Sequence, residues 1–230
     1  MIKHLSTRRM FIVAVIPALL GLTAQADLNE PFGRPAVLST EVSVSATWQD
    51  LRLQIQSEQR IIAQCRTDPH SCPSPAALQF LAIVKAGDQY KGHARLGHIN
   101  RAVNLAIRSV KDSAAHTTWT SPLEALAAGF GDCKQFVLLK YAALADAGFA
   151  PHDLRLIIVR IKALQNEPHA VIAVRNQGRW SILDSRSMAM VESNKLLGYY
   201  EPELTLDHRG VRRFVQPFNA MVALRGQSVQ

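Results

Sequence analysis

The feature that most constrains the fold is a change of hydrophobic period at Gly148. Before it, apolar residues recur every three or four positions, which is typical of packed helices. After it, short runs rich in β-branched and aromatic residues predict strands at 154–161, 169–174 and 179–184, and two more strands flank 207–210. Helices followed by antiparallel strands indicate the α+β class.

The composition fits one globular domain. Apolar residues make up 48% of the 230 residues and charged residues 19%, which excludes collagen and low-complexity disorder. The formal charge of +8 comes from scattered basic residues without a long basic run, so nucleic acid is not indicated as a partner. The Cys and His residues lack zinc-site spacing, and the glycines form no phosphate-binding loop.

Residues 1–26 predict a secretory signal peptide. A basic start without acidic residues is followed by an apolar run at 10–22 and by the cleavage pattern Ala-Gln-Ala at 24–26. The apolar run has 13 residues, whereas a membrane-spanning helix needs about 20. A signal peptide is therefore favoured over a membrane anchor. Adjacent arginines in the basic part leave both general secretion and twin-arginine export open.

After removal of the signal peptide, the remaining chain is expected to consist of a short leader and one domain. Residues 27–40 are polar and contain proline, so we expect an extended leader there, and residues 41–230 are expected to form one domain. Once the signal is removed, no second long apolar run remains to span a membrane. The protein is therefore predicted to be periplasmic or secreted, in an oxidising compartment.

Three cysteines fall into two kinds. Cys65 and Cys72 flank an Asp-Pro turn, which could bring their Cα atoms within the roughly 5.5 Å of a disulfide. Cys133 is left over, and an unpaired cysteine in an exported protein is an intermolecular partner, a reactive thiol or an inert buried residue. Its sequence context favours the reactive thiol.

The residues before Cys133 predict two helix starts in succession. Ser121, Pro122 and Glu124 have the pattern of an N-cap, a first helical position and a capping-box partner. Gly129 and Gly131 end this short helix, and we expect them to let a substrate backbone approach closely.

Asp132 opens the next helix and places Cys133 in its first turn. The body of that helix is mostly apolar, so it should be buried and should hold its N-terminus rigidly. The positive end of the helix dipole stabilises negative charge on sulfur. The backbone N–H of Cys133 is also a natural donor to an oxyanion.

The strand pair after Gly148 supplies two further groups. The Asn-Gln-Gly sequence at 176–178 predicts a hairpin turn. If its first two residues form the loop, His169 lies opposite Asp184, and a three-residue loop shifts the partner to Ser185. Both faces of the strand that begins with His169 are apolar, so the hairpin should be central and covered on both sides.

Cys133, His169 and Asp184 together predict a catalytic triad. In such a triad the carboxylate orients the imidazole, and the imidazole deprotonates the thiol. Taken singly, the histidine has an ordinary structural interpretation and the aspartate is a common turn former. Their order, after a leftover cysteine at a helix start, favours the catalytic interpretation.

Several motifs between residues 96 and 214 share a known pattern: Asn100 and Asn104, Trp119-x-Ser121-Pro122-x-Glu124, Gly131-Asp132-Cys133, Leu139-Lys140-Tyr141, His169-Ala170-Val171, Leu183-Asp184, and Tyr200–Phe214, which ends in a Gly-containing hairpin. With these motifs the chain resembles the bacterial transglutaminase-like cysteine proteinases, the family of the LapG-type periplasmic proteases. The resemblance implies a papain-like, transglutaminase-like core and the triad Cys133, His169 and Asp184. It also implies a protein substrate, with a surface adhesin and a regulatory protein as candidate partners.

The sequence departs from the LapG-type pattern beside the nucleophile. Those relatives carry a carboxylate directly after the cysteine and bind regulatory calcium there, whereas this chain has Lys134 followed by Gln135. A cation at this position repels Ca²⁺, which needs several oxygen ligands. We therefore predict no cofactor, and we expect Lys134 to place its positive charge near the sulfur.

The predicted function is a periplasmic cysteine protease that cleaves a surface or exported protein through a thioester acyl-enzyme. Two alternatives remain. The same thioester could pass its acyl group to an amine, as in a transglutaminase or amidase. The chain could also be a non-catalytic binding domain with the same fold, and a cysteine no more reactive than a free thiol would favour that alternative.

Overall fold

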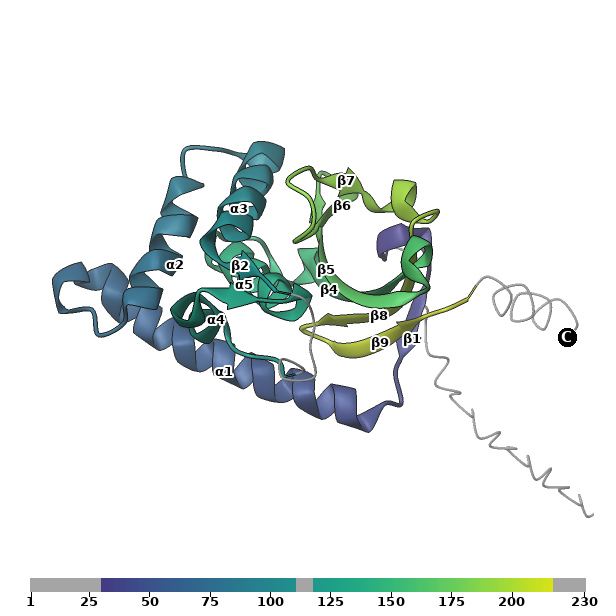
Figure 1. Ribbon diagram of the computed structural model, residues 1–230, viewed down its shortest axis with the longest axis horizontal. Coiled ribbons are helices and arrows are strands. Elements are labelled where there is room, and N and C mark those ends of the chain that lie inside the picture. Colours follow the sequence, from purple (N-terminus) through teal and green to yellow (C-terminus); the bar gives the residue numbers. More distant parts are fainter. Residues whose placement is uncertain (1–29, 111–117, 217–230) are drawn as a thin grey trace, which may run out of the picture.

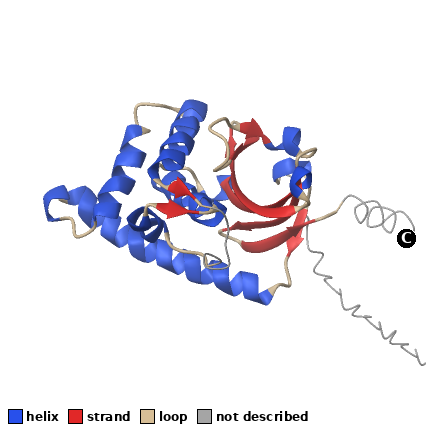
Figure 2. Cartoon of the chain, in the orientation of Figure 1, coloured by secondary structure: helices blue, strands red, loops and turns tan. Residues whose placement is uncertain are grey.

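The computed structural model describes residues 30–110 and 118–216, so the predicted signal peptide at 1–26 lies outside the described residues. Helices gather on one side of a strongly curved antiparallel sheet (Figure 1 and Figure 2). The described α-helices are α1 (Val42–Thr67), α2 (Pro75–Ala86), α3 (Gly92–Ala106), α4 (Pro122–Ala128) and α5 (Cys133–Asp146). The α+β class predicted from the sequence is confirmed.

Seven strands form the main sheet in the order β1-β9-β8-β4-β5-β6-β7, and all of its pairs are antiparallel. Its strands are β1 (Ala36–Leu38), β4 (Leu154–Ile161), β5 (Glu167–Asn176), β6 (Arg179–Leu183), β7 (Val191–Glu192), β8 (Tyr200–Asp207) and β9 (Gly210–Phe214). The central hairpin is covered on both sides, as predicted. Ile172 packs with the helices, whereas Val171 packs on the other side with Phe32.

The third helix lies earlier in the chain than its hydrophobic pattern suggested. The apolar residues of 97–110 recur on one helical face and predict a helix over that range, but α3 ends at Ala106. The next residues form β2 (Arg108–Ser109), which pairs in parallel with β3 (Phe130–Gly131). Residues 108 and 109 therefore leave the helix because their backbone pairs with a segment about 20 residues later. The hydrophobic period of the local sequence contains no information about such a pairing.

Within the segment expected to be an extended leader, 27–40, residues Ala36–Leu38 form the edge strand β1. β1 pairs with β9, and a single 3-10 turn, η1 (Pro31–Gly33), precedes it. The Glu30 side chain is fully buried. Glu30 is buried because its carboxylate forms ion pairs with arginines more than a hundred residues away in the chain.

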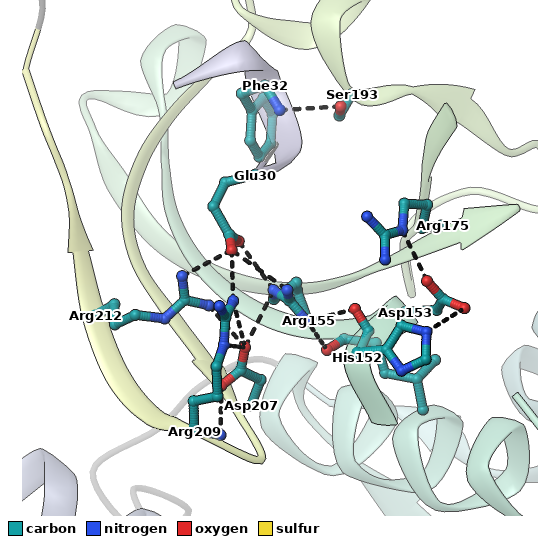
Figure 3. Close-up of polar contacts among 11 residues, drawn as sticks. Glu30, Phe32, His152, Asp153, Arg155, Arg175, Ser193, Asp207, Arg209 and Arg212 are labelled. Carbon is teal, nitrogen blue, oxygen red and sulfur yellow. Dashed lines mark hydrogen bonds and ion pairs between the residues drawn. The ribbon is translucent and has the colours of Figure 1, made fainter. Parts of the chain in front are cut away.

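Those partners form a group that we call the arginine cluster: Glu30, Asp207, Arg155, Arg209 and Arg212 (Figure 3). Arg155 Nε lies 2.9 Å from Glu30 Oε2 and 3.1 Å from Asp207 Oδ2. Arg212 places one nitrogen 2.7 Å from each carboxylate, and Arg209 Nη2 lies 2.8 Å from Glu30 Oε1. The cluster ties the N-terminal segment to strands β4, β8 and β9.

The register of the β5–β6 hairpin differs from both predicted alternatives. Asn176 pairs with Arg179, so the loop consists of Gln177 and Gly178. These two residues have φ values of 51° and 77°, as a tight hairpin loop with a glycine in second place requires. Neither Asp184 nor Ser185 is therefore the ladder partner of His169, because continued pairing would place position 186 there.

The predicted Cys65–Cys72 disulfide is present, with a Cα–Cα distance of 4.5 Å. It joins the end of α1 to the turn before α2 and leaves Cys133 as the free cysteine. Within the ranges 30–110 and 118–216, no helix combines the length and the hydrophobicity that crossing a membrane requires.

Candidate active site

Cys133 is the first residue of α5, as its sequence context predicts, and it is partly exposed. Asp132 is the N-cap, and its carboxylate accepts a hydrogen bond from the backbone N–H of Lys134 at 2.8 Å. Gln135 completes a capping box by accepting from the Asp132 N–H at 3.0 Å. These bonds fix the first helical turn, so the sulfur is presented by a rigid helix whose body is buried.

The preceding helix and the two glycines also follow the prediction in part. Ser121 and Glu124 form the predicted capping box of α4. Gly129 ends the helix with a φ of 71°, where a residue with a side chain would be strained. Gly131 has a different reason from the one we expected, since a Cβ there would lie 2.5 Å from the Gln135 Cβ. Its small size makes room for the capping side chain of α5.

The structure brings His169 and Asp184 together at the predicted end of the hairpin. His169 Nε2 lies 2.8 Å from Asp184 Oδ1, and both residues are buried. Cys133 lies near enough to the same imidazole to help raise its pKa. Asp184 reaches the ring although it is not a ladder partner, because β6 ends at Leu183 and the chain turns there.

These contacts shift the proton affinities in opposite directions. Burial lowers the pKa of His169, but hydrogen bonds and charge from Asp184 and Cys133 outweigh it and raise the pKa to about 9. Burial raises the pKa of Asp184, but the His169 and Tyr200 contacts outweigh it and lower the pKa to about 2. The geometry therefore favours an imidazolium held against a carboxylate.

Tyr200 is a site residue that sequence reasoning missed. Its hydroxyl donates to Asp184 Oδ2, and its ring lies 6.3 Å from the His169 ring, centroid to centroid, at an interplanar angle of 29°. The backbone N–H of Arg186 donates to Asp184 Oδ1 at 3.0 Å. Both carboxylate oxygens are thus held. In the sequence, Tyr200 begins the segment 200–214 that contributes to the family resemblance, but no role was assigned to it.

Two asparagines on α3 hold the turn that carries Asp184. Asn104 Nδ2 donates to the backbone oxygens of Asp184 at 2.9 Å and Ser187 at 3.0 Å. Asn100 Nδ2 donates to the backbone oxygens of Ser187 at 3.1 Å and Met188 at 3.2 Å. Their spacing of four residues puts both side chains on one helix face. The motif quoted for the family resemblance therefore supports the turn after β6.

A hollow of about 380 Å³ borders the turn that leads to the nucleophile. Gly131 and Gln135 form its side nearest Cys133, and Ala125, Ala128 and Phe130 give it an apolar lining. Neither Cys133 nor His169 is among its lining residues, so the hollow lies along the turn before α5 rather than at the Cys133 sulfur.

A model of the family described as bacterial transglutaminase-like cysteine proteinase matches residues 60–200. The chain belongs to this family. It is a transglutaminase-like cysteine peptidase, as the sequence predicts. A search of curated protein sequences gives no match.

Solved structures of LapG from Legionella pneumophila share the fold. The calcium-bound form has a TM-score of 0.56 and 18% identity, over 66% of this chain and 87% of that one. The EGTA-treated form has a TM-score of 0.54 and 16% identity, over 70% and 90% of the two chains. At these identities the likeness concerns the fold.

The calcium-bound LapG structure corrects our prediction that no cofactor is involved. That prediction was wrong because it generalised from the single residue Lys134 in a family with a calcium-binding member. In this chain Lys134 Nζ lies 2.6 Å from Asp132 Oδ2, so the lysine pairs with the carboxylate at the helix start. The described residues include no group of three or more His, Cys, Asp or Glu side chains able to hold a metal, and we derive no step through calcium.

Proposed function

We propose that this peptidase is a periplasmic protease in which Cys133 is the nucleophile, His169 the general base and Asp184 the residue that orients the imidazole. The observation that carries the proposal is the contact of one buried imidazole with both partners, the Asp184 carboxylate at 2.8 Å and the Cys133 sulfur. Thiol, base and orienting acid within hydrogen-bond reach are the arrangement that activates a nucleophile.

The acylation half-reaction begins with transfer of the thiol proton to His169. The thiolate then attacks the peptide carbonyl carbon, and the N–H of Cys133 donates to the oxyanion that forms. As the C–N bond breaks, the imidazolium protonates the leaving amine. Asp184 stays ionised throughout and stabilises the imidazolium, consistent with its pKa near 2.

The deacylation half-reaction restores the enzyme. A water molecule gives a proton to His169 and attacks the thioester, and the acid product leaves as the thiolate re-forms. An amine in place of water would instead give acyl transfer, the transglutaminase or amidase alternative.

The proposed setting rests on the N-terminal sequence. We propose that residues 1–26 direct export and are removed, and that the described domain acts on a surface or exported protein such as an adhesin. Glu30 lies four positions after Ala26 and is buried in the arginine cluster. Cleavage at Ala26 would therefore leave the anchoring residue in the mature protein.

Mass spectrometry of exported proteins tests the function. Cells with the wild-type protein are compared with cells carrying Cys133→Ala, each with Ca²⁺ and with EGTA because Legionella LapG binds calcium. A protease gives new peptide termini that depend on Cys133. Amine-linked products would support acyl transfer, and identical termini in all samples would contradict the proposal.

A further inference from the structure

The helix that carries the nucleophile also contains a buried charge that the mechanism above does not use. Lys140 in α5 is 1% exposed, and its Nζ has no hydrogen-bond partner among the residues that the structure describes. Burial of an ammonium group without a hydrogen-bonded partner is costly. An apolar side chain of similar size could be buried here at a lower cost in free energy, so stability alone does not account for the lysine.

The position of Lys140 points toward the active site. It follows Cys133 by seven residues, about two helical turns, so both side chains project from the same face of α5. That helix packs against β5, which contains His169, and against α3. From α3, Asn104 bonds to the backbone oxygen of Asp184. The elements around Lys140 are thus those that build the site.

Asp184 is the charged group that acts on Lys140. Burial lowers the pKa of Lys140 to about 7, and the negative charge of Asp184 opposes this shift. The interaction is reciprocal, so an ammonium at position 140 favours the ionised form of Asp184. When the thiol proton has moved to His169, the triad carries one net negative charge, which the ammonium balances.

We propose that Lys140 is a positioning residue, the buried counter-ion of Asp184 in the active site. It acts through the carboxylate, which it keeps ionised and directed at His169, and so supports the state in which Cys133 is a thiolate. This inference rests on the proposed function of the triad. It adds a fourth, fully enclosed residue that touches neither substrate nor reacting atoms.

The test is the rate at which iodoacetamide alkylates Cys133 at about pH 6, where an ordinary thiol is almost wholly protonated. We expect Lys140→Met to lower this rate about tenfold, the scale of coupling between neighbouring groups. The melting temperature is measured on the same samples, because removal of one partner of a buried charge pair also destabilises a fold. Lys140→Gln keeps a donor without the charge, and we expect the same loss of rate.

A double-mutant cycle shows whether Lys140 acts through the carboxylate. In an Asp184→Asn background, Lys140→Met should change the rate less than about twofold. Lys85→Met removes the same charge from an exposed position on α2 and should have no effect. Unchanged rates in both Lys140 variants, or equal losses in both backgrounds, would overturn the inference.

A second cycle separates failure of the inference from failure of the proposed function. This cycle uses the wild type, Lys140→Met, Asp184→Asn and the double variant. Their free energies of unfolding report the Lys140–Asp184 coupling without any reaction of the thiol. Non-additive changes support the counter-ion role, and additive changes refute it. A wild-type Cys133 no more reactive than a free thiol would refute the triad instead, whichever result the unfolding cycle gives.

Discussion

The arginine cluster and the proposed triad are two groups of charges in one small domain, and they are built differently. In the arginine cluster, three guanidinium groups enclose two carboxylates whose side chains are fully buried (Figure 3). Around the triad, one carboxylate serves an imidazole and a tyrosine hydroxyl, and a thiol completes the chain of contacts.

The difference lies in which groups can exchange protons. Guanidinium stays charged at every physiological pH, so the arginine cluster can hold segments together but cannot move a proton. Imidazole and thiol change protonation near neutral pH, and their neighbours shift that balance. A buried charge cluster in this fold therefore serves architecture or chemistry according to its residue types rather than its burial.

The largest effect is expected from removal of the reacting groups. Cys133→Ala should abolish turnover, and His169→Ala should lower it by at least about a thousandfold, because the groups act as a unit. Both losses are measured as rates of peptide cleavage on the substrate that the mass-spectrometric comparison identifies. His152→Ala, which removes a largely exposed histidine beside Asp153, is the matched control, and near-normal activity of His169→Ala would exclude the assigned base.

The arginine cluster should show the opposite behaviour. Asp207→Asn removes a charge that Arg155 and Arg212 contact, and it should lower the free energy of unfolding by about 3 kcal/mol, as for a broken buried ion pair. The alkylation rate of Cys133 in the folded protein should stay unchanged. Denaturant unfolding and alkylation on one preparation check both, and a large loss of alkylation rate would erase the distinction between the two groups.

Smaller losses of turnover should separate the role of Asp184, which contacts His169, from that of Tyr200, which contacts Asp184. Asp184→Asn leaves the imidazolium without its counter-charge and should leave only weak activity. Tyr200→Phe removes only one donor to Asp184 Oδ2 and should cost about tenfold. A loss in Tyr200→Phe as large as that in Asp184→Asn would mean that the hydroxyl has a role of its own in the reaction.

The smallest expected effect is a pH dependence of stability. The pKa of His169 is raised from 6.5 to about 9, so its stabilisation is present below about pH 6.5 and is lost as the pH rises through 9. The lowered pKa of Asp184 gives stabilisation that is present above about pH 4 and is lost toward pH 2.

The direction of the His169 effect is tested by measuring the free energy of unfolding of the wild type and of His169→Gln at pH 6 and pH 10. We expect the wild-type advantage to shrink at the higher pH. The destabilisation caused by Asp207→Asn, measured at the same two pH values, serves as the comparison. An advantage of the wild type that grows with pH would reverse the assignment of His169.

Much of the fold follows from local sequence patterns. Capping residues located the starts of α4 and α5, and the Cys65–Cys72 bridge follows from a turn between two cysteines. The hairpin register was wrong because the turn signal at 176–178 fits more than one loop. Only the observed positive φ values of Gln177 and Gly178 decide which residues form it.

The features that sequence reasoning missed depend on contacts between distant residues. Glu30 meets Arg155 across 125 positions, so a polar segment that looked like a leader is instead anchored in the core. Tyr200 and Lys140 gain their roles from the packing of separate elements around Asp184. A single lysine within a helical pattern carries no local signal that its ammonium will be enclosed.

The most direct test of the central claim is the alkylation rate of Cys133 at pH 6 in the wild type and in His169→Ala. The pKa of His169, raised to about 9, keeps the imidazole protonated at this pH, so the sulfur has a cationic partner beside it. We expect the wild type to react about a hundredfold faster than the variant, with mass spectrometry locating the label on Cys133. Equal rates, both close to that of a free thiol, would contradict a Cys133–His169–Asp184 triad.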